Sequence, residues 1–398
     1  MRTQLVASNQ TVVDGIHRFQ YIDILRGMAI LGVIAVHSEQ QIENLYPLVR
    51  SIFNYGQLGV QLFFLASALT LCFSMSERNE KNKFNFYLRR FFRIAPLYYL
   101  GIIFYFFWRV LKNYIEIGSM MPLPEYTLFG IIENIFFIHG FDPKNFNFVV
   151  PGGWSIATEM YFYAMFPLLF SIQSKLGYKD FLRFSIKIIV LSFLIQIVII
   201  NVIEPKLIDY GFLKSKIVND EFGFIYCTIL NQISVFLIGI LTYQRLQNQS
   251  ASIHTLFFAF ILCCISCYLL NTSNFKTGYN GFVYPILSSI AYSIVASRLS
   301  KSGHIKGLTA EALAKIGQVS FSIYLIHFFI LDLLKIIYRR TTFLSFTNPE
   351  IELLILFTTL IAISYVIARF LNAFVEKPVI NYGKKFISRK EILKPIAK

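Results

Sequence analysis

The sequence predicts an all-α protein, a polytopic membrane bundle of about ten transmembrane helices with one further short helix that is re-entrant or interfacial. Hydrophobic residues make up 56% of the 398 residues and charged residues only 15%, whereas soluble domains carry about a quarter charged residues. The mean hydropathy is +0.58. Because no long polar stretch interrupts the apolar segments, we expect a single integral-membrane domain over 1–398. It would have a short leader at 1–20 and a basic tail at 377–398.

The predicted transmembrane helices come from apolar segments of spanning length, about 20 residues. They lie at about 24–44, 57–75, 94–111, 154–174, 186–203, 224–243, 253–270, 281–298, 317–338 and 351–375. A further apolar segment, 127–139, is too short to cross a bilayer and is predicted to be the re-entrant or interfacial helix.

The sequence indicates neither a nucleic-acid partner nor a bound metal. The formal net charge is +15, but the basic residues fall in short loops between apolar segments. That pattern is typical of membrane orientation, so we expect no nucleic-acid partner. The five cysteines lie in apolar segments and lack the paired spacing of zinc ligands, so we expect no metal site.

The distribution of Lys and Arg predicts the orientation of the chain. With the leader on the cytoplasmic side, most of the 37 basic residues fall in cytoplasmic segments, including the tail at 377–398. This is the bias that cytoplasmic loops carry. We therefore expect both termini in the cytoplasm. If 127–139 were a full span, all later segments would lie on the opposite side of the membrane, and the excess of Lys and Arg in cytoplasmic segments would be lost.

The first predicted helix carries two ionisable side chains, Arg26 and His37. Their spacing is close to three helical turns, so they share one face and lie roughly 16 Å apart along the axis. Ionisable groups inside a membrane span are costly, rare and usually functional. We expect Arg26 near one membrane surface and His37 close to mid-depth. Asp23, three residues before Arg26, is expected to pair with it.

The third predicted helix begins with a basic run that contains Arg89, Arg90 and Arg93. Arg90 and Arg93 are neighbours on one helical face, and guanidinium groups pair well with phosphate oxygens. With Arg26 they would suit a polyphosphorylated ligand such as coenzyme A. The alternative is that these side chains only enforce topology. For Arg89 we favour that interpretation, and for Arg90 and Arg93 both stay open.

The fourth predicted helix follows a Gly152-Gly153 turn and carries a carboxylate inside its apolar run. Glu159 lies more than one turn into the helix, and a buried carboxylate needs a partner. It could orient a histidine, bind a sugar hydroxyl or pair with an arginine. Trp154 at the start of the helix is also explained as an interface anchor.

Two further histidines lie near or within apolar runs. His327 lies in the ninth predicted helix, where it either has a substrate or helper role or bonds to a neighbouring helix. His139 closes the short segment 127–139, and a structural role is favoured there. Asp332 is expected to pair with Lys335, and Glu376-Lys-Pro378 is expected to stop the last helix.

These blocks together resemble the acyltransferase-3 family of bacterial membrane acyltransferases. The matching motifs, in chain order, are Arg26 with His37, the segment 59–67, Arg90 with Arg93, Trp154-Ser155 with Glu159, Tyr324–His327, and Glu376–Pro378. The resemblance covers roughly 18–382. The chain departs from the family pattern at Ser67-Ala68, where Ser-Gly is usual. We expect the variant without the C-terminal esterase-like domain that some relatives carry.

The resemblance implies transfer of an acyl group, usually acetyl, from cytoplasmic acyl-coenzyme A to a hydroxyl of a cell-surface or lipid-linked carbohydrate at the bacterial inner membrane. Arg26, Arg90 and Arg93 would hold the coenzyme A phosphates. His37 would act as a general base or carry the acyl group itself, and Glu159 or His327 would orient His37 or the acceptor. The acceptor would contact Trp154, Ser155, Tyr161 and Tyr163. The main alternative from another class is a transporter or flippase of a glycan or lipid.

Overall fold

The computed structural model describes the chain over 2–78, 83–118, 126–209, 223–248, 253–272, 280–302, 305–340 and 348–392. These residues are helical apart from turns and loops, and no strand occurs among them. Ten helical stretches in the described part of the chain are long and apolar enough to cross a membrane. The predicted all-helical class and the predicted number of spans are therefore confirmed.

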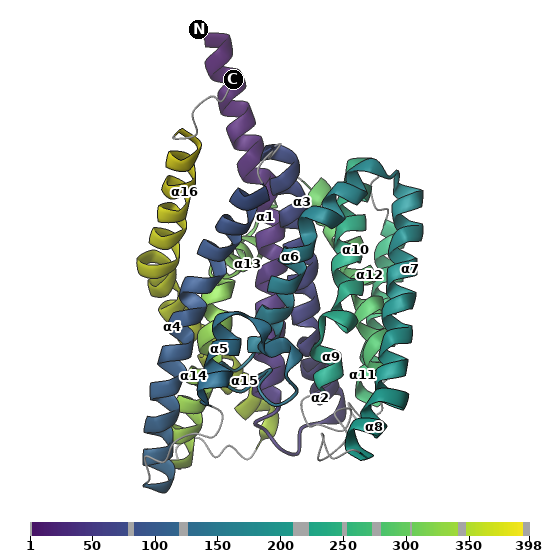
Figure 1. The fold of residues 1–398 in the computed structure, drawn as a ribbon. Helices are drawn as coiled ribbons and strands as arrows, with labels where there is room; N and C mark the ends of the chain where they lie inside the picture. Colours follow the sequence, from purple (N-terminus) through teal and green to yellow (C-terminus); the bar gives the residue numbers. More distant parts are fainter. Residues whose placement is uncertain are drawn as a thin grey trace.

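The helices follow one another as a single antiparallel bundle (Figure 1). The first half of the chain forms α1 (Arg2–Glu39), α2 (Pro47–Asn54), η1 (Tyr55–Leu58), α3 (Gly59–Arg78), α4 (Lys83–Ile117), α5 (Leu128–Ile135), η2 (Ile138–Phe141), α6 (Gly153–Lys175), α7 (Tyr178–Val198), η3 (Ile199–Ile203) and α8 (Glu204–Asp209). The second half forms α9 (Phe224–Cys227), α10 (Ile229–Asn248), α11 (Ile253–Thr272), α12 (Asn280–Lys301), α13 (Leu308–Gln318), α14 (Ser320–Arg340), α15 (Pro349–Leu371), η7 (Asn372–Glu376) and α16 (Lys377–Ile392).

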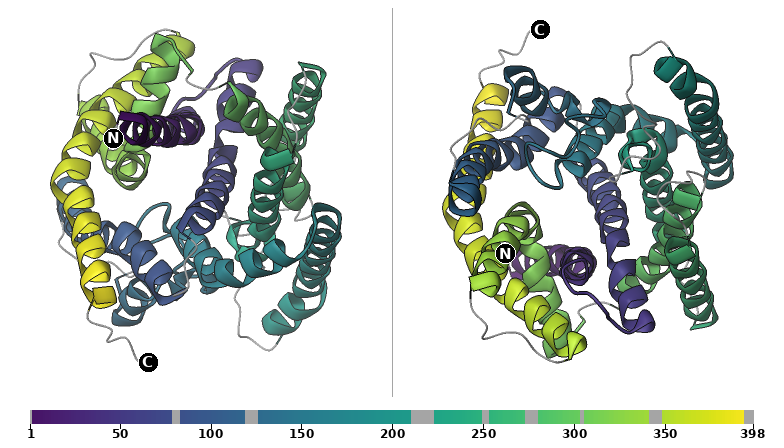
Figure 2. Two further views of the ribbon diagram at one scale, coloured as in Figure 1. Left: turned by 90° about the horizontal axis from the view of Figure 1, so that it is seen from above. Right: turned by 90° about the horizontal axis from the view of Figure 1, so that it is seen from below.

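Viewed along the bundle axis, α4 and α16 lie side by side at one edge, and α7 lies at the opposite edge (Figure 2). The backbone of the predicted leader continues α1 from Arg2, and the predicted tail is helical as far as Ile392. The last residues of that tail lie outside the described part of the chain.

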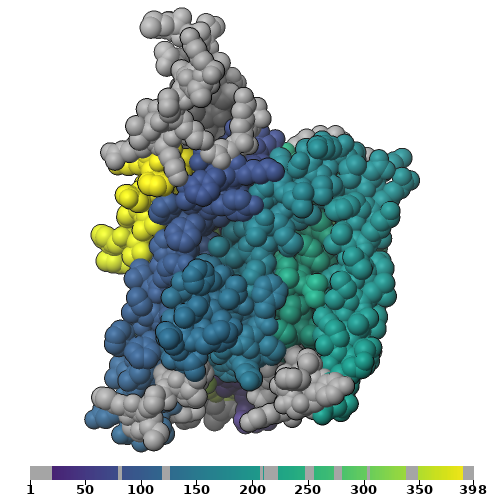
Figure 3. Space-filling model, in the orientation of Figure 1, coloured from purple at the N-terminus to yellow at the C-terminus, as the bar shows by residue number. Residues whose placement is uncertain are grey.

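The short segment at 127–139 forms α5 and part of η2, and it is not one of the spans. Side chains of α4 hold it in place. The hydroxyl of Tyr98 donates to Asn134 at 2.6 Å, and that of Tyr99 donates to the carbonyl oxygen of Ile135 at 2.8 Å. These bonds provide partners for polar groups that could form no hydrogen bond with lipid. The segment covers the bundle between α4 and α6 (Figure 3).

Helix α1 contacts α13 through two glycines. A Cβ atom at Gly27 would lie 2.2 Å from the carbonyl oxygen of Leu313, and one at Gly317 would lie 1.8 Å from that of Asp23. Small residues let helix backbones approach this closely in membranes. The contact holds the turn of α1 that carries Arg26 against α13.

Two predicted helix ends differ from the structure. The segment predicted as one helix at 317–338 is divided, because α13 ends at Gln318 and α14 begins at Ser320. The predicted stop at Glu376–Pro378 is wrong. A π-helical turn, η7, leads directly into α16, and Pro378 is the second residue of that helix. Proline lacks a backbone donor, and the π-helical turn directly before Pro378 already interrupts the regular α-helical hydrogen bonds.

Ala68, the departure from the family motif, packs against α10. A Cβ atom at Gly239 would lie 2.6 Å from that of Ala68. Alanine stands after Ser67, where glycine is usual, and the opposite helix has a glycine at the contact. Only one of the two positions has room for a methyl group.

We predict that Gly239→Ala destabilises the protein and that adding Ala68→Gly restores much of the loss. Overpacking a close contact costs about 1–3 kcal/mol, and exchanging the two residues keeps the total volume. Thermal unfolding of the purified protein in detergent measures the effect, with Ala68→Gly alone as the control. Equal melting temperatures for Gly239→Ala and the wild type would show that α3 and α10 do not pack this closely.

Candidate active site

Three cavities follow one another through the bundle. The basic groove, about 170 Å³, lies where α4 meets α16, and its cations are Arg78, Arg89, Arg90, Arg93 and Lys384. The arginine pocket, about 70 Å³, has as its main polar residues Arg26, Ser67, Thr70, Arg90, Arg93 and Glu159. The histidine chamber, about 280 Å³, has as its main polar residues His37, Gln40, Asn54, Gln57, Asn147 and Trp154.

Adjacent cavities share side chains. Arg90 and Arg93 line both the basic groove and the arginine pocket. Val60 and Tyr324 line both the arginine pocket and the histidine chamber. The three cavities therefore adjoin in a fixed order, with two arginines at the first boundary and a valine and a tyrosine at the second.

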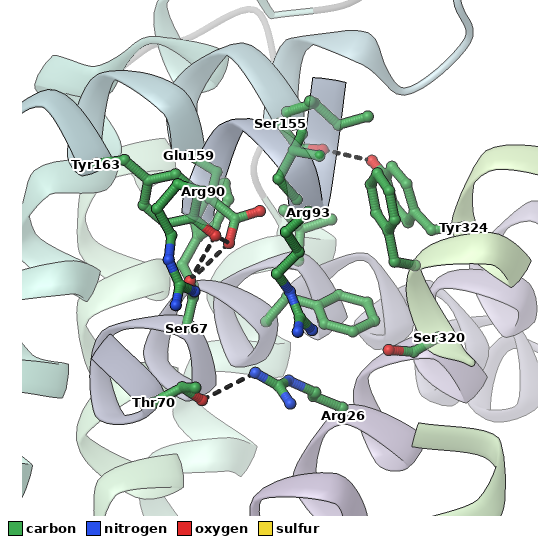
Figure 4. A pocket seen from close by; sticks show the side chains of 16 residues that line it. Arg26, Ser67, Thr70, Arg90, Arg93, Ser155, Glu159, Tyr163, Ser320 and Tyr324 are labelled. Atoms are coloured by element: carbon green, nitrogen blue, oxygen red, sulfur yellow. Dashed lines mark hydrogen bonds between the residues drawn. The ribbon is translucent and has the colours of Figure 1, made fainter. Parts of the chain in front are cut away.

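The structure brings Arg26, Arg90 and Arg93 into one pocket (Figure 4). Arg26 is 17% exposed, donates to the hydroxyl of Thr70 at 2.8 Å and lies 3.5 Å from the carboxylate of Asp23, so the predicted pair within α1 is confirmed. The guanidinium of Arg90 lies over the ring of Tyr163 at 5.9 Å. Its Nε is buried and has no hydrogen-bond partner among the described residues.

Glu159 lies in the arginine pocket and not beside a histidine. Its carboxylate accepts a hydrogen bond from the hydroxyl of Ser67 at 2.6 Å and another from the hydroxyl of Tyr163 (Figure 4). Of the three partners predicted for Glu159, the structure favours the arginine cluster. Ser67 belongs to the motif at 59–67, but the sequence pattern alone assigned no role to this residue.

His37 lines the histidine chamber, and the buried His327 packs behind it with ring centroids 5.4 Å apart. The ring of Phe328 packs against both, at 4.4 Å and 4.2 Å. Helix α1 ends at Glu39, earlier than predicted, so His37 lies in its last turn. His327 lies near the middle of the membrane-spanning part of α14. The sequence left open whether His327 orients His37 or the acceptor, and it gave no signal for the contact between the two rings.

Tyr324 separates the arginine pocket from the histidine chamber. Its hydroxyl lies 2.7 Å from that of Ser155 and donates to the carbonyl oxygen of Gly152 at 3.1 Å. Gly152 has a φ of +79°, and a Cβ there would lie 2.9 Å from the Tyr324 hydroxyl. The turn before α6 thus needs glycine both for its backbone conformation and for this contact.

The four residues predicted to contact the acceptor, three aromatic residues and one serine, do not form one surface. Trp154 lines the histidine chamber, and Ser155 and Tyr163 line the arginine pocket. Tyr161 stacks on Phe141 of η2 at 4.4 Å. Of these four residues, only Trp154 lines the same cavity as His37.

His139 and Asp332 have structural partners. The Nε2 of His139 lies 3.1 Å from the carbonyl oxygen of Gly153, and burial lowers the pKa of the histidine to about 4. Neutral His139 therefore links η2 to α6. Asp332 pairs with Lys112 at 2.7 Å, so the predicted pair with Lys335 is wrong. The sequence gave no signal for Lys112, because Lys112 lies on α4 and Asp332 lies on α14, far apart along the chain.

The family model of the acyltransferase domain, acyltransferase 3, matches residues 19–369. The chain belongs to the acyltransferase-3 family. It is a multi-pass integral membrane protein, and its family implies an acyl donor. Comparisons with curated proteins and with solved structures give no match.

The matched segment of this acyltransferase contains every side chain that lines the arginine pocket and the histidine chamber. Within the described residues, no three His, Cys, Asp or Glu side chains come together as metal ligands.

We predict that the arginine pocket attracts anions. A cysteine at Thr70, with the five native cysteines replaced by serine, should react with a sulfonate-bearing methanethiosulfonate roughly tenfold faster than with a trimethylammonium one. Three guanidinium groups face one carboxylate in this lining. A cysteine at Gln57 in the histidine chamber is the control and should show little preference. The same ratio at both sites would contradict the charge assignment.

Proposed function

We propose that this acyltransferase moves an acyl group, expected to be acetyl, from cytoplasmic acyl-coenzyme A to a hydroxyl of a cell-surface or lipid-linked carbohydrate at the bacterial inner membrane. The observation that carries the proposal is the order of the cavities: cations first, a tyrosine boundary second, and the chamber lined by His37 last. A polyanionic donor and an uncharged hydroxyl acceptor need these two different surroundings.

The donor phosphates would bind in the basic groove and the arginine pocket. Arginine recognises phosphate through paired N–H donors, and the buried Nε of Arg90 has no protein acceptor among the described residues. Arg89, first interpreted as topological, lines the same groove. The groove lies on the side of the bundle where α16 lies (Figure 1). Binding of a cytoplasmic donor there puts this side in the cytoplasm, as the positive-inside bias predicts.

The hydrogen bonds of the two histidines define which ring nitrogens can react. His37 Nδ1 lies 3.0 Å from the side-chain oxygen of Gln40, which can only accept, so Nδ1 carries the proton. His327 Nδ1 likewise donates to the carbonyl oxygen of Tyr324 at 2.7 Å. In the neutral rings the lone pair is then on Nε2, and His327 Nε2 is buried without a partner among the described residues.

Two reaction routes use the Nε2 lone pair of His37. As a general base it takes the proton of the sugar hydroxyl while that oxygen attacks the thioester carbonyl. The new C–O bond replaces the C–S bond, and the leaving thiolate receives the proton. As a nucleophile it forms an acyl-imidazolium and releases the thiolate. The sugar hydroxyl then attacks the acyl carbon, the C–N bond breaks to restore the neutral ring, and the hydroxyl proton passes to the thiolate. We assign to His327, whose ring lies 5.4 Å from that of His37, the stabilisation of the charged ring in the first route.

We predict that His37→Ala lowers acyl transfer by about 10²–10⁴-fold, the usual contribution of a positioned proton-transfer group. His327→Ala should cause a smaller loss and change the pH profile, because it acts through its neighbour. Inverted membrane vesicles supplied with radiolabelled acetyl-coenzyme A measure the label that enters glycan. Normal labelling by a correctly inserted His37→Ala protein would overturn the assignment. A transporter would leave the label on coenzyme A in every variant.

We predict that Arg90→Ala with Arg93→Ala raises the KM for acetyl-coenzyme A by at least about tenfold, because each charged hydrogen bond contributes about 1.5–3 kcal/mol. The control is Arg183→Ala, an exposed arginine of α7 paired with Asp180. It removes one positive charge at a residue that lines none of the three cavities. Initial rates against donor concentration give the comparison, and an unchanged KM in the double variant would rule out phosphate binding by this pair.

A further inference from the structure

The lining of the histidine chamber is polar but carries no charge at neutral pH. Four amide side chains face it, those of Gln40, Asn54, Gln57 and Asn147. Among the described residues of this lining there is no Asp, Glu, Lys or Arg. This contrasts with the arginine pocket next to it, where three cations and a carboxylate line a volume about a quarter as large.

The amides are held in place and still have hydrogen-bonding capacity. Asn147 accepts from the backbone N–H of Gly152 at 2.8 Å, and Gln57 donates to Asn54 at 3.3 Å. Asn54 in turn donates to Asn271 at 3.0 Å. An amide side chain has both donors and an acceptor. The amide N–H groups of Asn147 therefore stay available to a ligand, as does the side-chain oxygen of Gln57.

Aromatic rings form another part of the chamber. Trp154 and Tyr226 both line it, with ring centroids 6.0 Å apart. Sugar rings have faces of C–H groups and edges of hydroxyl groups. Large rings can cover such faces, while a few placed polar groups bind the edges. The chamber offers both kinds of surface within reach of His37.

A charged acceptor would find no counter-ion among the side chains of this lining that the structure describes. Burying a carboxylate or ammonium group without a partner is costly, whereas hydroxyl groups are satisfied by amides. Glu39 lies two residues beyond His37, but it pairs with Arg50 at 3.2 Å. Its charge is therefore already balanced.

We infer that the acylated sugar residue is uncharged, a neutral or N-acetylated sugar, and that Asn147 and Gln57 bind its hydroxyl groups against Trp154. Uronic acids, sialic acids and free amino sugars are excluded from the acceptor position because the described residues of the lining offer no counter-ion. This inference rests on the proposed function, because it assigns the class of acceptor to the same site.

The test identifies the residue that is modified. Cells with and without the protein are supplied with deuterated acetate, their envelope glycans are hydrolysed into short fragments, and mass spectrometry locates the label. Label on a neutral or N-acetylated residue supports the inference. Label on an acidic or free amino sugar overturns the inference and leaves the proposed function intact. No protein-dependent label in any glycan overturns the proposed function, and the inference with it.

A variant links the outcome to the chamber. Asn147→Ala should raise the KM for the labelled glycan fraction by about tenfold and leave the KM for acetyl-coenzyme A unchanged. Asn201→Ala, at an exposed amide of η3, is the matched control. Equal acceptor KM values for the two variants would remove Asn147 from acceptor binding. A change in donor KM alone would place the residue in donor binding and overturn the assignment of this chamber to the acceptor.

Discussion

The site depends on keeping three guanidinium groups inside an apolar bundle. Buried cations need counter-charges or acceptors, and the structure supplies both, from the same helix and from neighbouring ones. Asp23 and Thr70 hold Arg26, and the carboxylate of Glu159 faces the pocket that Arg90 shares with it. The hydroxyl groups of Ser67 and Tyr163 hold that carboxylate in turn. The excess of positive charge that remains favours a polyanionic ligand over an empty pocket.

The same arrangement separates two kinds of chemistry. Charge is confined to the groove and the pocket, while the chamber contains imidazole, amide and aromatic groups. Tyr324 stands between them, bonded to Ser155 and to the backbone of Gly152. A low-charge chamber favours neutral histidine, which is the form that both reaction routes need. The arginines would hold the donor far enough away to leave the imidazoles uncharged.

Most of the fold could be predicted because hydrophobic length acts locally. Each span is an apolar stretch, and the short 127–139 segment failed the same length criterion that the spans met. The failures involve interactions that are not local. A π-helical turn carries the chain through Glu376 to Pro378, and Lys112 on α4 replaces Lys335 on α14 as the partner of Asp332. Neither result follows from residue type and spacing within one helix.

By itself the sequence determined the helices, the residues with ionisable groups and the family motifs, since all of these depend on the order of residues along one segment. It also placed Arg90 and Arg93 on one face of α4, because helical periodicity is local. Only the tertiary structure decided that His37 meets His327, that Glu159 belongs with the arginines, and that Trp154 and Tyr163 lie in different cavities. The physical reason is that packing between helices sets these distances, and close contacts such as Gly27 with Leu313 and Gly239 with Ala68 fix that packing across long stretches of sequence.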